Sequence, residues 1–320
     1  MTAATVEGGG VPRRVLVTGG GGFIGRACLP RLVAAGHEVH AVTSRPDPEP
    51  VAGVRWHRAD LLDVGTLDAL CAAVRAEDLL HLAWVTTPGS YTHSAANLDW
   101  TAASLHLVRR FVDHGGQRIV GAGTCFEYGH RDAAPLHETT SPLLPDTLYG
   151  TSKVALASVI ARYAQEAGVA FAWGRVFFLY GPHEHPNRLV SSVIRALLDG
   201  REAPCTIGTQ MRDFLYVHDV AAAFVALLGC DVTGPVNVAS GEAVSVRDLV
   251  LEIGDQLGRR ELVALGARPL SPADPPVVVA DVARLRDEVG FVPAFRLPDG
   301  LADSIRWWRS HDPPSRSEPR

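Results

Sequence analysis

The chain has 320 residues, of which 47% are hydrophobic and 20% charged, and its formal net charge at pH 7 is −5. A chain of this length can bury one large core, or one core with a smaller appended lobe. Its acidic balance argues against a nucleic-acid partner, and because no apolar stretch is long enough to cross a membrane, we expect a small-molecule partner and no membrane.

A glycine-rich segment follows the first predicted strand, residues 15–18. Gly19, Gly22 and Gly25 stand three residues apart, a helical pattern begins near Gly22, and a second apolar strand covers residues 38–43. This is the spacing of a βαβ unit, in which backbone N–H groups at the start of the helix bind a pyrophosphate. A flexible loop is the alternative for the glycines alone, but the flanking elements favour dinucleotide binding.

The second strand ends in Thr43, Ser44 and Arg45. At this place a cofactor with a free ribose 2′-hydroxyl is usually bound by Asp or Glu, whereas Arg suits a 2′-phosphate. The sequence therefore favours NADP(H) over NAD(H). The alternative is a solvated Arg45 in a proline-rich loop.

Apolar runs alternate with helical patterns up to about residue 180, which is typical of a doubly wound parallel sheet. The predicted fold is α/β, a Rossmann domain over residues 12–180, with a smaller α+β substrate-binding lobe over 181–310. We expect about 210–230 to return to the Rossmann domain, and 1–11 and 311–320 to be flexible tails. Strands are predicted at 15–18, 38–43, 54–57, 79–83, 118–122, 169–175 and 235–239, with an extended segment at 214–217. Helices are predicted from about 22, 64, 97 and 149, and at 189–198, 220–228, 246–257 and 301–308.

The five cysteines are dispersed and form no C-x-x-C pair. No His cluster has metal-ligand spacing, so we predict neither a disulfide framework nor a metal site. The N-terminal residues lack the pattern of a signal peptide, and we expect a cytoplasmic protein.

Tyr149 and Lys153 are four residues apart at the start of a predicted helix, so they share one face. The Lys153 ammonium could lower the pKa of the Tyr149 phenol toward that of a working acid/base. Thr124 follows the strand predicted at 118–122 and could polarise the same substrate oxygen. The alternatives are a turn hydroxyl for Thr124 and a half-buried aromatic for Tyr149.

Together these motifs resemble the extended short-chain dehydrogenases/reductases of the nucleotide-sugar epimerase/dehydratase/reductase family over nearly the whole chain. Further motifs of the resemblance are Asp60-Leu61, His81-Leu82-Ala83, Tyr180-Gly181-Pro182, Arg212-Asp213-Phe214 and the segment from Asn237 to Gly241. The resemblance implies catalysis by Thr124, Tyr149 and Lys153. It implies cofactor contacts from Gly19, Gly22, Phe23, Ile24, Gly25, Ser44, Arg45, Asp60, Leu61, Leu82, Ala83, Trp84, Tyr149 and Lys153. It implies substrate contacts from Thr86, Cys125, Asn187 and Arg212.

Two departures from the family pattern narrow the reaction. The Asp-Glu pair that follows the catalytic Thr in 4,6-dehydratases is replaced by Cys125 and Phe126, so dehydration is not expected. Phe178 replaces a common Asn, which implies a less polar sugar pocket and favours a deoxysugar. The sequence is most similar to 4-ketoreductases of nucleotide-linked 4-keto-6-deoxyhexoses.

The sequence thus favours NADPH-dependent reduction of the 4-keto group of a nucleotide-linked, dTDP-type 6-deoxyhexose. An NAD-dependent 4-epimerase is the first alternative. An epimerase-reductase like GDP-fucose synthase, using Cys125 with His183 or His185, is another. The alternative for these residues is that Cys125 packs in the core and that the histidines order a loop. The alternative from another class is a non-catalytic dinucleotide sensor.

The resemblance also implies a homodimer built from the helices that begin near Asn97 and Tyr149. These helices carry apolar stripes that suit either a dimer interface or core packing. The stripe residues are Leu105, Val108, Phe111, Val154, Leu156 and Ile160.

Overall fold

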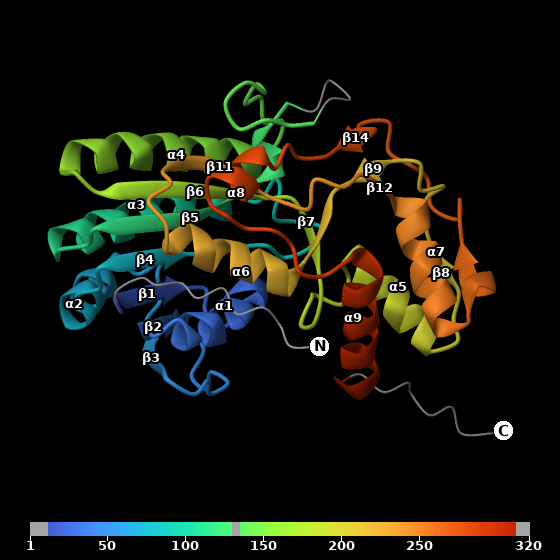
Figure 1. The fold of residues 1–320 in the computed structure, drawn as a ribbon, viewed down its shortest axis with the longest axis horizontal. Helices are drawn as coiled ribbons and strands as arrows, with labels where there is room; N and C mark the ends of the chain where they lie inside the picture. The colour runs from blue at the N-terminus through green and yellow to red at the C-terminus, as the bar shows by residue number, and fades with distance from the viewer. Residues whose placement is uncertain (1–11, 130–134, 312–320) are drawn as a thin grey trace.

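The computed structural model describes residues 12–129 and 135–311, and its main element is a seven-stranded parallel sheet in the order β11-β6-β5-β4-β1-β2-β3 (Figure 1). Its strands are β1 (Arg14–Thr18), β2 (Glu38–Thr43), β3 (Val54–Arg58), β4 (Asp78–His81), β5 (Arg118–Thr124), β6 (Ala170–Val176) and β11 (Gly234–Val238). The strand order reverses between β1 and β4, and ligands of such sheets bind outside the carboxyl ends of the strands at this point. The predicted Rossmann fold with a smaller lobe is confirmed.

Two layers of helices cover the sheet, because side chains of each strand alternate between its faces. Val15 and Val17 face the core shared with α1 (Phe23–Ala34) and α6 (Val217–Leu228). Leu16 faces the core on the other side of the sheet. The helices that cover this side are α2 (Val64–Val74), α3 (Ala96–Asp113) and α4 (Leu148–Ala167).

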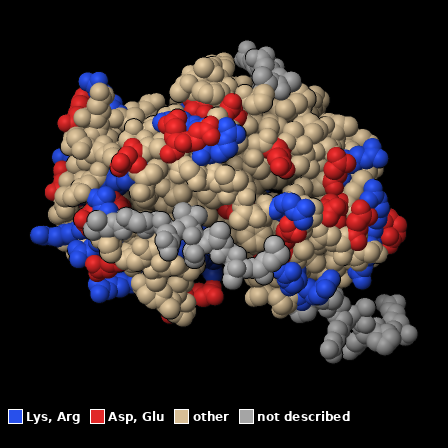
Figure 2. Space-filling model, in the orientation of Figure 1, with Lys and Arg blue, Asp and Glu red and all other residues tan. Residues whose placement is uncertain are grey.

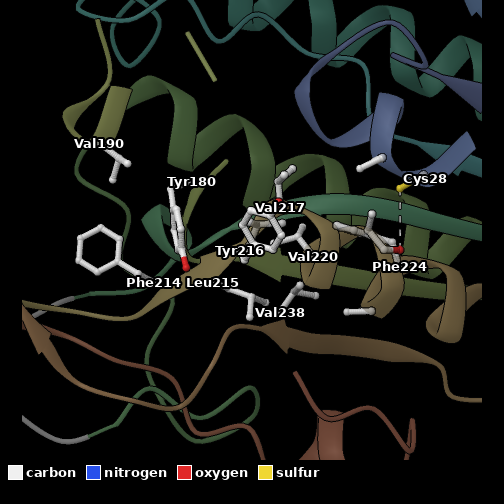
Figure 3. Close-up of a cluster of buried hydrophobic side chains, with 14 of the residues drawn as sticks. Cys28, Tyr180, Val190, Phe214, Leu215, Tyr216, Val217, Val220, Phe224 and Val238 are labelled. Atoms are coloured by element: carbon white, nitrogen blue, oxygen red, sulfur yellow. Dashed lines mark hydrogen bonds between the residues drawn. The ribbon is translucent and has the colours of Figure 1, made fainter. Parts of the chain in front are cut away.

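After the first part of the smaller lobe, the chain returns to the main sheet, where α6 packs against α1. Figure 3 shows Val217, Val220 and Phe224 of α6 in one buried cluster, with the Cys28 thiol of α1 donating to the carbonyl of Ala221 at 3.9 Å. The helix begins at Val217, which the sequence placed in an extended segment. The strand β10 therefore ends one residue earlier, at Tyr216.

The smaller lobe combines short strands with helices, on the right of Figure 1. Its small sheets have the orders β10-β7, β12-β9-β14 and β13-β8. The strands are β7 (Phe178–Tyr180), β8 (Ala203–Pro204), β9 (Met211–Arg212), β10 (Phe214–Tyr216), β12 (Val244–Ser245), β13 (Val263–Ala264) and β14 (Val277–Val278). The helices of this lobe are α5 (Leu189–Leu198), α7 (Val246–Leu257) and α9 (Leu297–His311), whereas α8 (Ala283–Asp287) packs beside β11 of the main sheet. Among the described residues, the 3-10 helices are η1 (Cys125–Glu127) and η2 (Arg260–Leu262).

Several boundaries differ from those predicted. The strand predicted at 79–83 ends at His81. Leu82 N still donates to the Thr18 carbonyl of β1 (3.2 Å), but Ala83 N donates to the Thr18 side chain (3.3 Å) rather than to a strand carbonyl. The helix predicted at 301–308 runs from Leu297 to His311. The predicted flexible tails lie outside the described residues, except His311, which is helical.

The apolar stripes on α3 and α4 are mainly core. Val108, Phe111, Leu156 and Ile160 are at most 2% exposed and belong to the cluster beneath these helices. Of the two interpretations of these four residues, a dimer interface or core packing, core packing is correct. The apolar side chains that α3 and α4 do expose are different ones, Leu98 and Val159.

Candidate active site

The glycine-rich loop is closely packed at Gly19 and Gly25 but has open space at Gly21. Gly19 has a φ of 71°, which suits glycine, and a Cβ on Gly25 would lie 2.2 Å from the carbonyl oxygen of Gly19. A Cβ on Gly21 would meet nothing within 4 Å. The loop thus leaves free space on one side of the α1 N-terminus, which Phe23 and Ile24 begin. This open cradle fits a dinucleotide pyrophosphate.

A pocket of about 160 Å³ adjoins this cradle. It is lined by Gly20 and Gly21, by Arg45 after β2 and by Trp56 of β3. The Arg45 guanidinium has no carboxylate partner within the described residues. The pocket therefore combines a glycine-lined wall with the Arg45 guanidinium, and the carboxylates of Asp47 and Glu49 also line it.

Arg26 is a pocket residue that the sequence analysis missed. Its Nε donates to the Gly21 carbonyl (3.0 Å), and its guanidinium forms an ion pair with Glu49. The side chain thereby joins the glycine loop to the segment after β2. Its position one residue after the last glycine of the motif is the signal that could have identified it.

The other residues expected around the adenosine lie where β2 and β3 end. Ser44 is exposed directly after β2, and Asp60 is exposed two residues after β3, with its Oδ1 accepting from Leu62 N (3.0 Å). Leu61 is buried in the core beneath α2. Ser44 and Asp60 are thus accessible at the ligand-binding edge of the sheet, whereas Leu61 mainly packs.

A buried histidine fixes the strand ends below the cradle. His81 Nδ1 lies 2.7 Å from the Thr18 hydroxyl, and its Nε2 lies 2.8 Å from the Ser104 hydroxyl. Because Ser104 donates to the carbonyl of Trp100 (2.7 Å), Nε2 is the donor and Nδ1 accepts from Thr18. Burial lowers the pKa of His81 to about 3, with a smaller effect of Lys153, so the ring is neutral. The His81-Leu82-Ala83 motif is evident in the sequence, but this structural role of His81 was not predicted from it.

Thr124, Tyr149 and Lys153 are brought together at the carboxyl edge of β5. Thr124 is the last residue of β5, and α4 places Tyr149 and Lys153 on one buried face. The helix starts at this place because the Thr147 hydroxyl accepts from Gly150 N (3.1 Å). A Cβ on Gly150 would lie 2.3 Å from the Phe126 carbonyl oxygen, so glycine permits the close approach of α4 to η1.

The phenol of Tyr149 is enclosed by three aromatic rings. Ring centroids of Tyr91, Phe126 and Trp84 lie 4.9, 6.1 and 6.5 Å from that of Tyr149. Burial raises the pKa of Tyr149 and the Tyr91 phenol raises it further, while the Thr124 hydroxyl lowers it. The balance is upward, so the predicted lowering of this pKa is wrong for this structure.

The position of Lys153 explains that result. Its Nζ donates to the Ala122 carbonyl (2.9 Å) and lies 3.7 Å from the centroid of the Trp84 ring. Burial lowers the pKa of Lys153 to about 7, against the Glu127 carboxylate, which raises it. The ammonium is thus held by a carbonyl and an aromatic face. Leu82 and Ala83 precede Trp84 on the same segment, with Ala83 buried.

The residues expected to bind substrate are dispersed. Thr86 is exposed and its carbonyl accepts from Arg188 Nη2 (3.3 Å), while Asn187 is exposed on the loop before α5. Arg212 is buried and its Nη2 donates to Asp274 Oδ1 (2.5 Å). Asp274 was not identified from the sequence.

Cys125 and the two loop histidines do not form the pair that a GDP-fucose synthase type of reaction would use. Burial raises the pKa of Cys125 to about 12. His183 lines the pocket beside Gly20, and its ring centroid lies 4.6 Å from that of Trp307 on α9. His185 is exposed and its Nδ1 accepts from Asn187 N (3.2 Å).

Surface charge and helix hydropathy add two observations. Figure 2 shows basic and acidic side chains interspersed over one face, among a majority of other residues. No helix in residues 12–129 and 135–311 has the length and apolar character required to traverse a bilayer.

The comparisons with known proteins agree with this geometry. Residues 15–239 match the NAD dependent epimerase/dehydratase family. The UDP-glucose 4-epimerase of Azospirillum brasilense is 32% identical, over 93% of this chain and 92% of that protein. The structure of MoeE5 in complex with UDP-glucuronic acid and NAD is 30% identical, with a TM-score of 0.80 over 93% of this chain and 99% of that one. The UDP-glucose 4-epimerase of Thermotoga maritima, solved with UDP-glucose, shares the fold, with a TM-score of 0.85 at 22% identity over 93% of this chain and 99% of that one. The chain therefore belongs to the NAD dependent epimerase/dehydratase family and is an NAD(P)-dependent enzyme that modifies nucleotide sugars.

Proposed function

We propose that this protein is a nucleotide-sugar 4-epimerase. The observation that carries the proposal is the buried cluster of Thr124, Tyr149 and Lys153, which within the described residues has no free carboxyl group beside it. Such a cluster can oxidise and reduce C4 of a sugar but has no acid to remove water from the intermediate. The similarity to the Azospirillum epimerase over nearly its whole length supports this reading.

In this mechanism Tyr149 acts first as the phenolate, which takes the proton of the C4 hydroxyl, and the resulting phenol returns that proton to the C4 oxygen after the 4-keto sugar has turned over. The Thr124 hydroxyl hydrogen-bonds the same oxygen, and the Lys153 ammonium stabilises the negative charge that develops on the phenol. When bound, the dinucleotide supplies hydride transfer. The glycine loop, with Arg26 beside it, would hold its pyrophosphate. The aromatic enclosure of Tyr149 excludes water from the proton transfer.

The neighbours of Thr124 support epimerisation over dehydration. The Cys125 thiol stays protonated at neutral pH because burial raises its pKa to about 12, and Phe126 carries no proton to transfer. Glu127, the next residue, is bound by Arg175 at 2.7 Å. Elimination across C5 and C6 would lack its base and its acid.

A second candidate is NADPH-dependent reduction of the 4-keto group of a dTDP-linked 6-deoxyhexose. Arg45 favours it, because a free guanidinium in the pocket suits a 2′-phosphate. Phe178 also favours it, since its ring lies 5.4 Å from the Arg212 guanidinium and makes that side of the site apolar. On this reading NADP(H) is preferred to NAD(H).

Both candidates share three further proposals. Residues 181–310 form mainly a substrate-binding lobe beside the Rossmann domain of residues 12–180, with about 210–230 returning to it. Arg212 and Asn187 hold the nucleotide diphosphate, and Thr86 and Cys125 lie beside the sugar. Two chains form a homodimer.

One experiment separates the candidates. Purified protein is denatured and assayed for released NAD, and the native protein is incubated with UDP-glucose while the anomeric proton signals are followed by NMR. Bound NAD and formation of UDP-galactose support the epimerase. Tyr149→Phe should keep the bound NAD but form no UDP-galactose. Oxidation of free NADPH by dTDP-4-keto-6-deoxyglucose, without epimerisation, supports the reductase instead. Dinucleotide binding without either reaction would favour the sensor.

A further inference from the structure

The carboxylate of Glu127 is completely buried one turn after Thr124. Its Oε1 accepts from Thr124 N and from Trp173 Nε1, each at 2.9 Å, and its Oε2 accepts from Arg175 Nε at 2.7 Å. Three donors on one buried carboxyl group suit the ionised form, which only accepts hydrogen bonds. Glu127 is therefore a buried structural carboxylate rather than a solvated one.

Gly123 gives this carboxylate its place. A Cβ on Gly123 would lie 2.2 Å from Trp173 Nε1 and 2.5 Å from Glu127 Oε1. The absence of a side chain at the penultimate residue of β5 thus lets Glu127 and Trp173 meet beside the strand. Thr124 is then fixed twice, because its amide donates to Glu127 and its hydroxyl accepts from Phe126 N at 3.3 Å.

The same carboxylate, which is ion-paired with Arg175, also acts electrostatically on Lys153. Burial lowers the pKa of Lys153 to about 7, and Glu127 is the group that raises it. Lys153 Nζ lies 5.6 Å from the ring centroid of Trp173, whose indole N–H donates to Glu127. The titratable and charged groups around the carboxylate are Lys153 and Tyr149 from α4, Arg175 from β6, and Cys125, Tyr128 and Glu138.

We propose that Glu127 is a positioning residue for the proposed reaction, which holds Thr124 at the end of β5 and supplies the negative charge that keeps the Lys153 ammonium in place. The inference rests on the proposed role of the Thr124, Tyr149 and Lys153 cluster. It assigns no substrate contact to Glu127 itself, because all three hydrogen bonds of its carboxylate go to the protein.

The test is Glu127→Gln, which keeps the shape and removes the charge. The pKa of Lys153 should fall, so the ammonium loses its proton at lower pH. The pKa of Tyr149 should move the same way, because Glu127 raises it in the wild type. We expect the alkaline limb of kcat/KM to move by about one pH unit to lower pH, and dinucleotide affinity at pH 8.5 to fall about tenfold, with less than about a twofold change at pH 5.5.

Glu138→Gln is the matched control. Glu138 is another buried carboxyl of the same network: its Oε1 accepts from Asn237 N (2.8 Å), and its backbone carbonyl accepts from Arg175 (3.1 Å). It has no contact with Thr124, so its variant should leave both pH profiles unshifted. An equal loss at every pH in Glu127→Gln, or the same shift in Glu138→Gln, would overturn the inference.

Two further results keep the test decisive. If Glu127→Gln does not fold, Glu127→Asp retains the charge with a shorter reach: kcat should fall while the alkaline limb stays in place, and a moved limb would contradict the inference. Dinucleotide affinity, measured by quenching of protein fluorescence, needs no sugar. Absence of sugar turnover in the wild type would therefore refute only the proposed function, whereas affinity that does not change with pH would refute the role of Glu127.

Discussion

At the scale of single residues, the environment of Tyr149 decides how its phenol transfers a proton. A phenol with a raised pKa keeps its proton at neutral pH and is ready to donate it. In the opposite direction the phenol has to accept a substrate proton after losing its own, and this requires an adjacent positive charge. Lys153 provides that charge only while it is protonated. The reactivity of Tyr149 is therefore tied to the groups that set the pKa of Lys153.

Replacing Tyr149 by Phe should lower kcat by about 10²- to 10⁴-fold, because the proton transfer is lost. The phenyl ring keeps the aromatic contacts, so dinucleotide affinity and Tm should remain near wild type. Tyr91→Phe is the control, since its ring packs edge-on against Tyr149 at 4.9 Å and is retained. Steady-state kinetics with either substrate pair checks the prediction. Equal losses in the two variants would contradict it.

His81 should make stability depend on pH. Its pKa is about 3 in the folded protein, below the usual 6.5, so between these values the unfolded chain binds more protons. Its contribution to stability is then present above pH 6.5 and is lost as the pH falls toward 3, by about 1.4 kcal/mol per pH unit. The free energy of unfolding, measured with urea from pH 4.5 to 7.5, should depend less steeply on pH in His81→Gln than in the wild type. His106→Gln, at an exposed position of α3, should keep the wild-type slope; equal slopes in all three proteins would be contrary evidence.

At the scale of elements, the sequence predicted what local patterning controls. The helix at 246–257 has the predicted bounds, and a local contact caps it, because the Ser245 hydroxyl accepts from Asp248 N at 2.9 Å. The early end of β4 was not predictable, since it depends on a hydroxyl of β1. Glu127 was missed for the same reason: its donors Trp173 and Arg175 lie more than 40 residues away. Contacts between distant segments leave no periodicity in the sequence.

The turn from β1 into α1 should be sensitive to one methyl group at Gly25 and not at Gly21. A Cβ on Gly25 would meet the Gly19 carbonyl oxygen at 2.2 Å, whereas one on Gly21 would meet open space. Gly25→Ala should therefore lower the free energy of unfolding by about 1–3 kcal/mol and weaken dinucleotide binding. Gly21→Ala should leave Tm unchanged. Thermal unfolding and dinucleotide titration of both variants test this, and similar Tm values would contradict it.

At the scale of the whole molecule, the site depends on both parts of the fold. The cradle, the pocket and the catalytic cluster come from the main sheet and its helices, while Arg212 and Asn187 come from segments after β6 (Figure 1). A substrate in contact with both would be enclosed between them. The helices α3 and α4 pack side by side, and they expose Leu98 and Val159 at 58% and 50%. If the proposed dimer forms through these helices, these two side chains would lie at its interface.

If α3 and α4 form the dimer interface, Val159→Arg should yield a monomer. The new charge would lie in an apolar contact between two copies, whereas in the isolated chain it lies in solvent and should alter the free energy of unfolding by less than about 0.5 kcal/mol. Val292→Arg is the control, because Val292 is an apolar residue 66% exposed and outside α3 and α4. Sedimentation equilibrium should give a dimer for the wild type and Val292→Arg, and a monomer for Val159→Arg. A wild-type monomer, or dissociation by Val292→Arg alone, would place the interface elsewhere or exclude it, because a symmetric dimer uses the same face of both chains.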